Sequence, residues 1–310
     1  MYNPHVYFDM SNKDYRNQAG ISKSDLDLIN TSMLHYFAGR FGDARKETAA
    51  FDVGTAVHYY VLEPERFKTH ILSYSDALPW IQENRDSKVK EITSKRGNVG
   101  QWLEEFRSIV EEKLLAEGDT DAPKMLSDSE KELICNMGKA ITSTVFYRKF
   151  MRGQKNEVSF MAEWNGMLCK CRADCWNEKA KMVADVKTVT DASPEGFQKA
   201  AAEHRYNVQA ALYREIMRAC GVEVNTFAFI AVEKKAPFAT AVYAYDSEAM
   251  DEGLEEAKEN IETYMEFMQK HFDEPLDENA GWGSMIRTVS LKPWQKRKRM
   301  LKRIDNGDDE

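Results

Sequence analysis

The sequence lacks any long apolar run. No stretch of its 310 residues approaches the roughly 18 to 20 apolar residues that a membrane-spanning helix needs. Residues 1–20 also have neither the basic start nor the apolar centre of a signal peptide. We therefore expect a cytoplasmic protein with no membrane partner.

Cysteine is scarce, and its number is odd. Of the five cysteines, Cys169, Cys171 and Cys175 lie within seven residues, and their C-x-C-x3-C spacing matches no common zinc pattern. Disulfides do not persist in a reducing compartment. An iron–sulfur cluster would need a fourth ligand that the sequence does not place. We expect Cys169 and Cys171 to serve as small apolar residues on one face of a strand.

Positive charge is in deficit, with 43 basic against 51 acidic residues and a formal net charge of −8. This balance argues against a protein coated in positive potential. The charge is uneven, however, because residues 292–303, KPWQKRKRMLKR, hold seven basic side chains. This run is either a solvated tail or an arm that contacts phosphates, with Trp294 available to stack or to anchor it.

The length allows one large domain or two small ones. Capping and apolar patterns predict a first helix from about residue 23, another that ends at Glu63-Pro64, and a third over roughly 128–150. Residues 76–135 are charged and mostly helical in pattern, which indicates an elaboration on the core. We predict one domain over residues 1–275, followed by a C-terminal segment, 276–310, with the basic run.

From residue 156 the pattern changes to strands. NEVSFMAEW alternates apolar and polar residues, the dipeptide NG favours a hairpin, and MLCKCRADCW and KMVADVKTV predict two further strands. A long helix over 195–220, two more strands and an amphipathic closing helix follow. This order predicts an α/β fold with a central mixed sheet flanked by helices.

Three charged residues stand within this strand region: Asp174, Asp185 and Lys187. Burying such charges is costly unless they are paired. Two carboxylates and a lysine on one surface can hold Mg²⁺ and position water beside a phosphate. A structural salt bridge at a strand end is the alternative, and D-x-K alone is a weak pattern. The upstream Asp, the apolar strand and the helix that follows favour the metal site.

At this point the sequence resembles the PD-(D/E)xK nuclease superfamily, in its RecB-like branch and most closely the RecE, or exodeoxyribonuclease VIII, type. The resemblance rests on ADCWNEKAKMVADVKTVTDASPEGF followed by HRYNVQAALYREI, and on GISKSDLDLI, FDVGTAVHYYVLEPERF, VSFMAEWNGMLCKCRAD and FIAVEKKAPFATAVYAYD. It implies a PD-(D/E)xK core with a mixed sheet and a helical elaboration over 76–135.

The resemblance also implies a metal site. Asp174 and Asp185 match the two motif acids, the second being Glu in many members, and Lys187 matches the motif lysine. His58 and Val186 complete the implied ligand set, and the implied ion is Mg²⁺, with Mn²⁺ as an alternative. By its sequence alone a single helical histidine is more often an ordinary core residue. The catalytic set further includes a strand glutamate, which is Glu157.

DNA contacts are implied as well. Gln209 and Tyr213 match a Q-x3-Y motif of the catalytic set, and their spacing places them on one helix face, with Arg205 one turn earlier. Ser22 and Ser24, at a helix start, resemble hydroxyl groups that contact a 5'-phosphate, and a helix N-terminus with hydroxyls suits an anion. Thr188 and Thr190, just beyond Lys187, are weaker candidates for phosphate contact.

The implied activity is a Mg²⁺-dependent 5'-to-3' exonuclease acting on double-stranded DNA ends in a bacterial or phage-infected cell. It would leave 3' single strands for a RecT-like annealing recombinase, and the resemblance implies a homo-oligomeric ring, a tetramer. The alternatives are a RecB-like nuclease with another polarity or endonuclease activity, and a non-catalytic DNA-binding member of the fold. Retention of Asp174, Asp185 and Lys187 disfavours the last of these.

Overall fold

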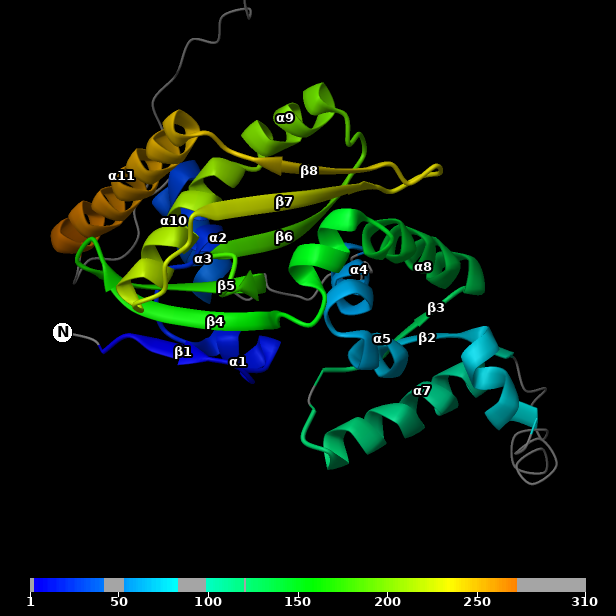
Figure 1. The fold of residues 1–310 in the computed structure, drawn as a ribbon. Helices are drawn as coiled ribbons and strands as arrows, with labels where there is room; N and C mark the ends of the chain where they lie inside the picture. Colours follow the sequence, from blue (N-terminus) through cyan, green and yellow to red (C-terminus); the bar gives the residue numbers. More distant parts are fainter. Residues whose placement is uncertain (1–2, 42–52, 83–98, 120, 272–310) are drawn as a thin grey trace, which may run out of the picture.

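The computed structural model describes residues 3–41, 53–82, 99–119 and 121–271 (Figure 1). The C-terminal segment over 276–310, with its basic run, lies outside these residues. In the N-terminal half the elements are mostly helices, with three short strands. They are β1 (His5–Tyr7), α1 (Asn12–Asn17), α2 (Lys23–Thr31), α3 (Met33–Phe41), α4 (Val53–Leu62), α5 (Pro64–His70), β2 (Ile71–Ser73), α7 (Val99–Ala116), β3 (Lys124–Leu126), α8 (Asp128–Thr142) and the π-helical turn η1 (Tyr147–Met151).

The second half carries the long strands and the helices between them. These elements are β4 (Lys155–Trp164), β5 (Met167–Asn177), β6 (Met182–Val189), α9 (Pro194–Glu203), α10 (Tyr206–Ala219), β7 (Thr226–Glu233), β8 (Thr240–Ala244) and α11 (Ser247–His271). The main sheet has six strands in the order β1-β4-β5-β6-β7-β8. Strands β6 and β7 are parallel and the other neighbouring pairs are antiparallel, so the predicted mixed sheet is confirmed.

The predicted hairpin between β4 and β5 turns at Asn165 and Gly166. Both residues have positive φ, 48° and 74°, as a two-residue type I′ turn requires. Asparagine and glycine are the residues that adopt this conformation most readily. The turn fixes the register in which Trp164 pairs with Met167 and Phe160 with Cys171.

The connection from β6 to β7 differs from the single long helix predicted over 195–220. It consists of two helices, α9 and α10, separated at Arg205, whose φ is 51°. The local pattern did not reveal the break, because a left-handed arginine is unusual and its cause is tertiary. Arg205 forms an ion pair with Glu256 at 2.9 Å and donates to Asn260 at 2.7 Å, both on α11.

The two faces of the sheet are covered by different helices (Figure 1). One core contains residues of α2, α3, α9, α10 and α11, and the other contains residues of α4, α5 and α8. Cys169 and Cys171 are fully buried in the first core, as small apolar residues on a shared strand face, and Cys175 is buried in the second. Apolar burial of this kind supplies most of the free energy that stabilises the fold.

The predicted helical elaboration, 76–135, contains α7 and the start of α8. It also contains a strand that the pattern did not predict: β3 pairs in parallel with β2 in a separate two-stranded sheet. Both strands have only three residues, too few to establish an alternation. In the part of the chain described, no helix is both long enough and apolar enough to cross a membrane.

Candidate functional site

The site lies where β5 and β6 separate. Their register runs from Asn177 opposite Met182 to Cys175 opposite Ala184. Beyond this pair, the side chain of Asp174 on β5 takes the place of a main-chain carbonyl as the acceptor for β6. Its Oδ2 accepts a hydrogen bond from Val186 N at 2.9 Å. Asp174 is thereby held with only 8% of its surface exposed. The sequence pattern thus correctly indicated a buried carboxylate on β5.

Asp185 and Lys187 project from β6, two residues apart and therefore toward the same face. Asp185 is 2% exposed, and its Oδ2 lies 2.8 Å from Lys187 Nζ. Burial alone would lower the pKa of Lys187, but the charges of Asp185 and Asp174 outweigh it and raise the pKa above its ordinary value. The lysine is therefore positively charged at neutral pH.

Helix α10 brings an amide to the same carboxylate. Gln209 Nε2 donates to Asp185 Oδ1 at 2.6 Å, in a buried hydrogen bond. One turn later, the Tyr213 ring packs edge-on against Phe227, at 5.8 Å between centroids. Burial, together with charges that include those of Asp185 and Asp174, raises the pKa of Tyr213, so the phenol stays neutral. Gln209 thus contacts the acidic cluster directly, whereas the Tyr213 ring packs on Phe227.

Helix α4 brings His58 to the other side of the cluster. Its Nδ1 lies 3.5 Å from Asp174 Oδ2, and its Nε2 lies 2.7 Å from the Val186 carbonyl oxygen. A carbonyl can only accept, so Nε2 carries the hydrogen of this bond. Burial lowers the pKa of His58, but the attraction of Asp174 and Asp185 outweighs it, and the net pKa is raised. Two predicted ligands, His58 and Val186, therefore hydrogen bond to each other here.

Glu157 lies on β4 and has a left-handed backbone, with φ of 52°. Such a conformation is strained for a residue with a side chain, and strain of this kind concentrates at functional sites. Its Oε2 forms an ion pair with Arg172 Nε at 3.1 Å. Burial, and then the charge of Asp174, raise the pKa of Glu157 to about 8, although Arg172 and His58 act in the opposite direction.

The donor set fits a divalent cation. One ligand atom each from His58, Glu157 and Asp174 lies within 4.8 Å of the others, the one such cluster among the described residues. Burial, and then the charge of Asp185, raise the pKa of Asp174 to about 6, because His58 and Lys187 compensate the buried negative charges only in part. Asp185 Oδ2 is buried and accepts no hydrogen bond of regular geometry. A cation would relieve both features, and oxygen-rich donors suit Mg²⁺ or Mn²⁺.

The predicted phosphate-contacting hydroxyls differ in their surroundings. Ser22 caps α2: its Oγ donates to Asp25 Oδ2 at 2.6 Å, and Asp25 also accepts from Ser22 N at 2.8 Å. Ser24 and Thr190 are exposed, and Thr188 is partly buried on β6 beyond Lys187. None of these four side chains forms part of the acidic cluster.

Lys23 was not predicted, because a lysine just after a helix cap carries no distinctive pattern. It forms an ion pair with Asp27 at 2.6 Å and is partly buried. Burial lowers the pKa of Lys23, with further lowering by the positive charges of Lys187 and Arg205. The predicted contact residue Arg205 is itself held by Glu256 and Asn260, with Asp27 3.4 Å away. The basic groups of Lys23, Lys187 and Arg205 thus lie near one another at the site.

The comparison with family models matches residues 22–279 to the PDDEXK-like domain of unknown function DUF3799. The match begins at the Ser22 cap and extends beyond α11, so it contains the site residues on α4, β4, β5, β6 and α10. It supports the PD-(D/E)xK superfamily and does not single out the RecE type. The comparison with curated proteins found no significant match.

Among solved structures, a candidate exonuclease from Eubacterium rectale is similar over 91% of this chain and 96% of its own, with 14% identity and a TM-score of 0.52. At that identity the similarity concerns the fold alone. A phage-related exonuclease from Haemophilus somnus 129PT matches over 33% of this chain and 57% of its own, at 14% identity and a TM-score of 0.24, which is too low to support any argument. The observed sheet, the position of Asp174, Asp185 and Lys187 on it, and the family match agree, and the chain belongs to the PDDEXK-like family DUF3799 and has an α/β PD-(D/E)xK core.

Proposed function

We propose that the protein is a metal-dependent exodeoxyribonuclease that digests double-stranded DNA from its 5' ends and leaves 3' single strands for recombination by strand annealing. The observation that carries the proposal is the convergence of Asp174, Asp185, Lys187 and Gln209, with His58 opposite. The family and the fold support a nuclease. The polarity, the product and the recombination role rest on the resemblance to the RecE type.

Within this proposal, His58, Glu157 and Asp174 would hold the ion, with Asp185 as a further ligand once its Oδ2 turns from Lys187. When bound, the ion supplies Lewis-acid polarisation of a phosphate oxygen and a lower pKa for water. Lys187 offsets phosphate charge and positions the attacking water, and Gln209 holds Asp185 in place. Val186, through its carbonyl, becomes a ligand only if His58 gives up its hydrogen bond.

The decisive assay uses linear duplex DNA labelled separately at each end, with Mg²⁺, with Mn²⁺ or with chelator. We expect digestion only with metal, and release of the 5'-terminal label first. Binding without digestion under every metal condition would refute a nuclease. Earlier release of the 3' label would reverse the polarity, and cleavage of covalently closed circles would indicate an endonuclease.

Substitution of the motif residues tests the site itself. Asp185→Ala and Lys187→Ala should each lower cleavage by about 100-fold or more, since the first removes a carboxylate from the proposed metal site and the second removes the positive charge that offsets the scissile phosphate. Lys179→Ala is the matched control, because Lys179 is an exposed lysine in the turn between β5 and β6. Circular dichroism should show all three variants folded. Full activity in either motif variant would refute the assigned site.

The same resemblance leads us to propose a homotetrameric ring that passes its product to a RecT-like annealing protein. A ring reconciles the net charge of −8 with DNA binding, since basic residues that converge on a channel set the local field. Light scattering on the purified chain should give four times the monomer mass. A monomer that digests DNA fully would refute the ring and leave the nuclease proposal intact.

A further inference from the structure

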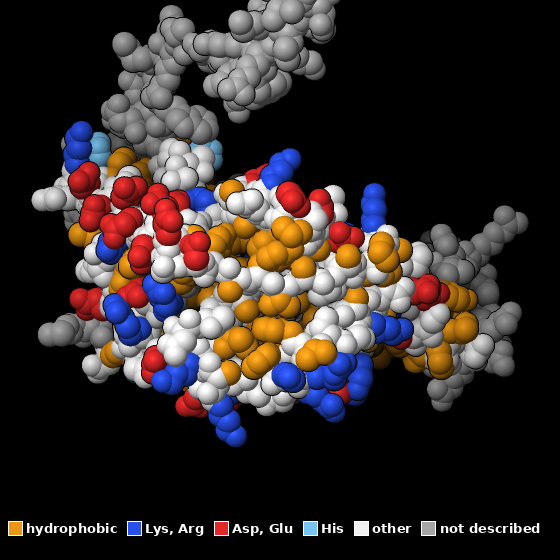
Figure 2. Space-filling view, turned by 45° about the horizontal axis from the view of Figure 1, so that its top comes forward, with side chains coloured by type: hydrophobic (Ala, Val, Ile, Leu, Met, Phe, Trp, Pro, Cys, Tyr) orange, Lys and Arg blue, Asp and Glu red, His pale blue; other side chains and the backbone are white. Residues whose placement is uncertain are grey.

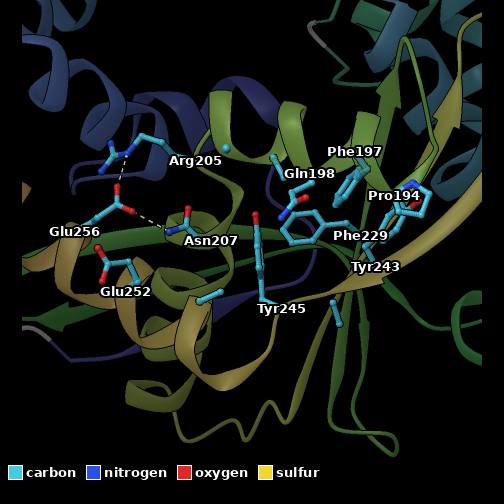
Figure 3. A pocket seen from close by; sticks show the side chains of 14 residues that line it. Pro194, Phe197, Gln198, Arg205, Asn207, Phe229, Tyr243, Tyr245, Glu252 and Glu256 are labelled. Carbon is cyan, nitrogen blue, oxygen red and sulfur yellow. Dashed lines mark hydrogen bonds and ion pairs between the residues drawn. The ribbon is translucent and has the colours of Figure 1, made fainter. Parts of the chain in front are cut away.

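A cavity of about 580 Å³ lies between α9, the start of α10, β7, β8 and the first turns of α11. This volume is within the roughly 300–1,000 Å³ typical of small-molecule sites. Figure 3 shows aromatic rings grouped at one end, charged side chains at the other, and Tyr245 between them. None of the metal-site residues lines the cavity, and the proposed nuclease chemistry does not use it.

The cavity is nevertheless a direct neighbour of the acidic cluster. Across the sheet, Asp185 on β6 is paired with Phe229 on β7, and Phe229 is paired with Tyr243 on β8. Paired residues of neighbouring strands project to the same face, and strands are about 4.8 Å apart. The Tyr243 backbone is therefore about 10 Å from that of Asp185, a separation that one nucleotide can span.

An unbroken series of contacts joins the two places. Lys187 Nζ lies over the Tyr206 ring, 4.8 Å from its centroid, and Tyr206 stacks on Phe229 at 5.2 Å. The Phe229 ring contacts the Phe197 ring at 6.1 Å, and Phe197 stacks on Tyr243 at 4.2 Å, with an interplanar angle of 10°. Phe197 and Phe229 are buried, whereas Tyr243 and Tyr245 are partly exposed. The floor is thus apolar, and the two tyrosines offer ring surface to an occupant.

The charges around the cavity limit what that occupant can be. Its α11 side carries Glu252 and Glu256; Glu256 pairs with Arg205 at 2.9 Å and accepts from Asn207 at 2.9 Å. Arg205 lines the same side and offsets the charge of Glu256, so it is the carboxylate of Glu252 that disfavours the DNA backbone there. Figure 2 shows hydrophobic side chains gathered in the middle of this face and acidic side chains gathered toward α11. A planar, uncharged group with exocyclic hydrogen-bond donors is complementary to this combination.

We propose that the cavity receives an unpaired nucleobase of the DNA strand, next to the phosphate held at the acidic cluster. The proposal rests on the proposed nuclease function and adds a base subsite to it. Every base has an aromatic face, so stacking on the Tyr243 ring accepts any sequence. Sequestering one base also separates the two strands where the backbone enters the site.

The test measures DNA binding by fluorescence anisotropy, with Ca²⁺ in place of Mg²⁺ and a Lys187→Ala background, so that no DNA is digested. Duplexes carry a single abasic nucleotide at each terminal position of either strand in turn. At one position we expect the abasic lesion to weaken binding by about 5- to 150-fold, which corresponds to the roughly 1–3 kcal/mol of one base–aromatic stack. At the other positions we expect little change.

Substitutions at Tyr243 test whether this loss of affinity, the abasic penalty, arises in the cavity. In Tyr243→Leu, which keeps an apolar side chain and removes the ring, the penalty should vanish. In Tyr243→Phe, which keeps the ring and loses only the hydrogen bond to the Ala192 carbonyl, it should persist. Tyr74→Leu, at an exposed tyrosine just after β2, is the matched control and should leave the penalty unchanged. Thermal unfolding checks that each variant is folded.

A flat abasic series, or an equal penalty in Tyr243→Leu, would overturn the base subsite. If Trp294→Ala then altered DNA binding only while Tyr243 was intact, the cavity would instead belong to the chain's own basic segment, residues 292–303. Digestion of duplex DNA by the unsubstituted protein in Mg²⁺ is a separate measurement. A failure there would refute the nuclease proposal, whereas active protein with a flat abasic series would refute the subsite alone.

Discussion

At the scale of single residues, the site is an arrangement of charges that the protein alone does not balance. The charge of Asp174 raises the pKa of Glu157, and the charge of Asp185 raises the pKa of Asp174, with Arg172, Lys187 and His58 as partial compensation. Burial raises the energy of every ionised member. The metal-free protein therefore carries a stored electrostatic cost, which a bound cation would relieve.

Glu157 makes this cost measurable as a pH dependence of stability. Its pKa of about 8 in the folded protein exceeds the ordinary value of 4.5, so between these pH values the folded state binds more protons than the unfolded state. Stability should then fall as pH rises through this window. The raised pKa of His58 acts in the same direction, since its stabilising contribution is lost as pH rises through the folded-state value.

We predict that Glu157→Gln, which removes the carboxyl and keeps its shape, gains thermal stability over the unsubstituted protein as pH rises from 5 toward 8, in chelator. Thermal unfolding followed by circular dichroism gives the comparison. Glu178→Gln, at an exposed glutamate paired with Lys155, is the control and should follow the unsubstituted protein. If the thermal midpoints of Glu157→Gln and the unsubstituted protein changed with pH by the same amount, Glu157 would not be the source of the pH dependence.

These residues differ in how far the sequence could predict them. Asp174, Asp185 and Lys187 were recognisable because charged residues interrupt apolar strands, whereas Gln209 and Tyr213 were identified by their match to a motif of the resembled family, which their spacing on one helix face supports. His58 required the family resemblance, since nothing local separates it from a core histidine. The left-handed backbone of Glu157 and the position of Lys23 depend on contacts between distant segments, which no local pattern records.

At the scale of elements, the close contact of α10 and α11 positions both the metal site and the cavity. Helix α10 carries Gln209 to Asp185 and Tyr206 to Lys187, and α11 packs against its first turn. The contact depends on Gly253, because a Cβ there would lie 2.5 Å from the backbone carbonyl of Asn207. The sequence predicted the helices themselves, but the division of α9 from α10 depends on this packing.

Gly253→Ala should therefore lower the thermal midpoint, because two backbones must separate. Overpacking of this kind costs about 1–3 kcal/mol, which the gain of about 1 kcal/mol in helix propensity offsets only in part. Gly39→Ala is a matched control: its nearest neighbour is the flexible Leu28 side chain, at 2.7 Å from the added Cβ. We expect Gly39→Ala to be neutral or stabilising, and an equal loss in both variants would contradict this account.

At the scale of the whole molecule, one mixed sheet joins two apolar cores and holds the acidic cluster between helices from opposite faces. His58 on α4 belongs to one face and Gln209 on α10 to the other. Strand order was predictable from sequence where short turns enforce it, as at Asn165-Gly166. The three-residue strands β1, β2 and β3 were not, because such short segments have no periodicity to detect.

A cation that binds across these elements should stabilise the entire fold. Binding only to the native state adds RT ln(1 + [L]/Kd), about 2.7 kcal/mol at a 100-fold excess over Kd. We predict that Mn²⁺ or Ca²⁺ raises the thermal midpoint in a concentration-dependent way, and that Asp174→Asn removes the increase. Glu178→Gln should retain it. Equal shifts in Asp174→Asn and the unsubstituted protein would place the ion elsewhere.

The hydrogen bond from Val186 N to Asp174 also determines which substitutions are informative. Asp174 is a candidate metal ligand, and its side chain also holds β5 to β6 by a hydrogen bond at the point where the main-chain pairing of the two strands stops. Loss of activity in Asp174→Ala would therefore combine lost chemistry with a loosened strand. Asp174→Asn retains an acceptor for Val186 N and removes the charge, so it separates the two effects. Lys187 forms no such hydrogen bond between strands, so Lys187→Ala can be interpreted directly.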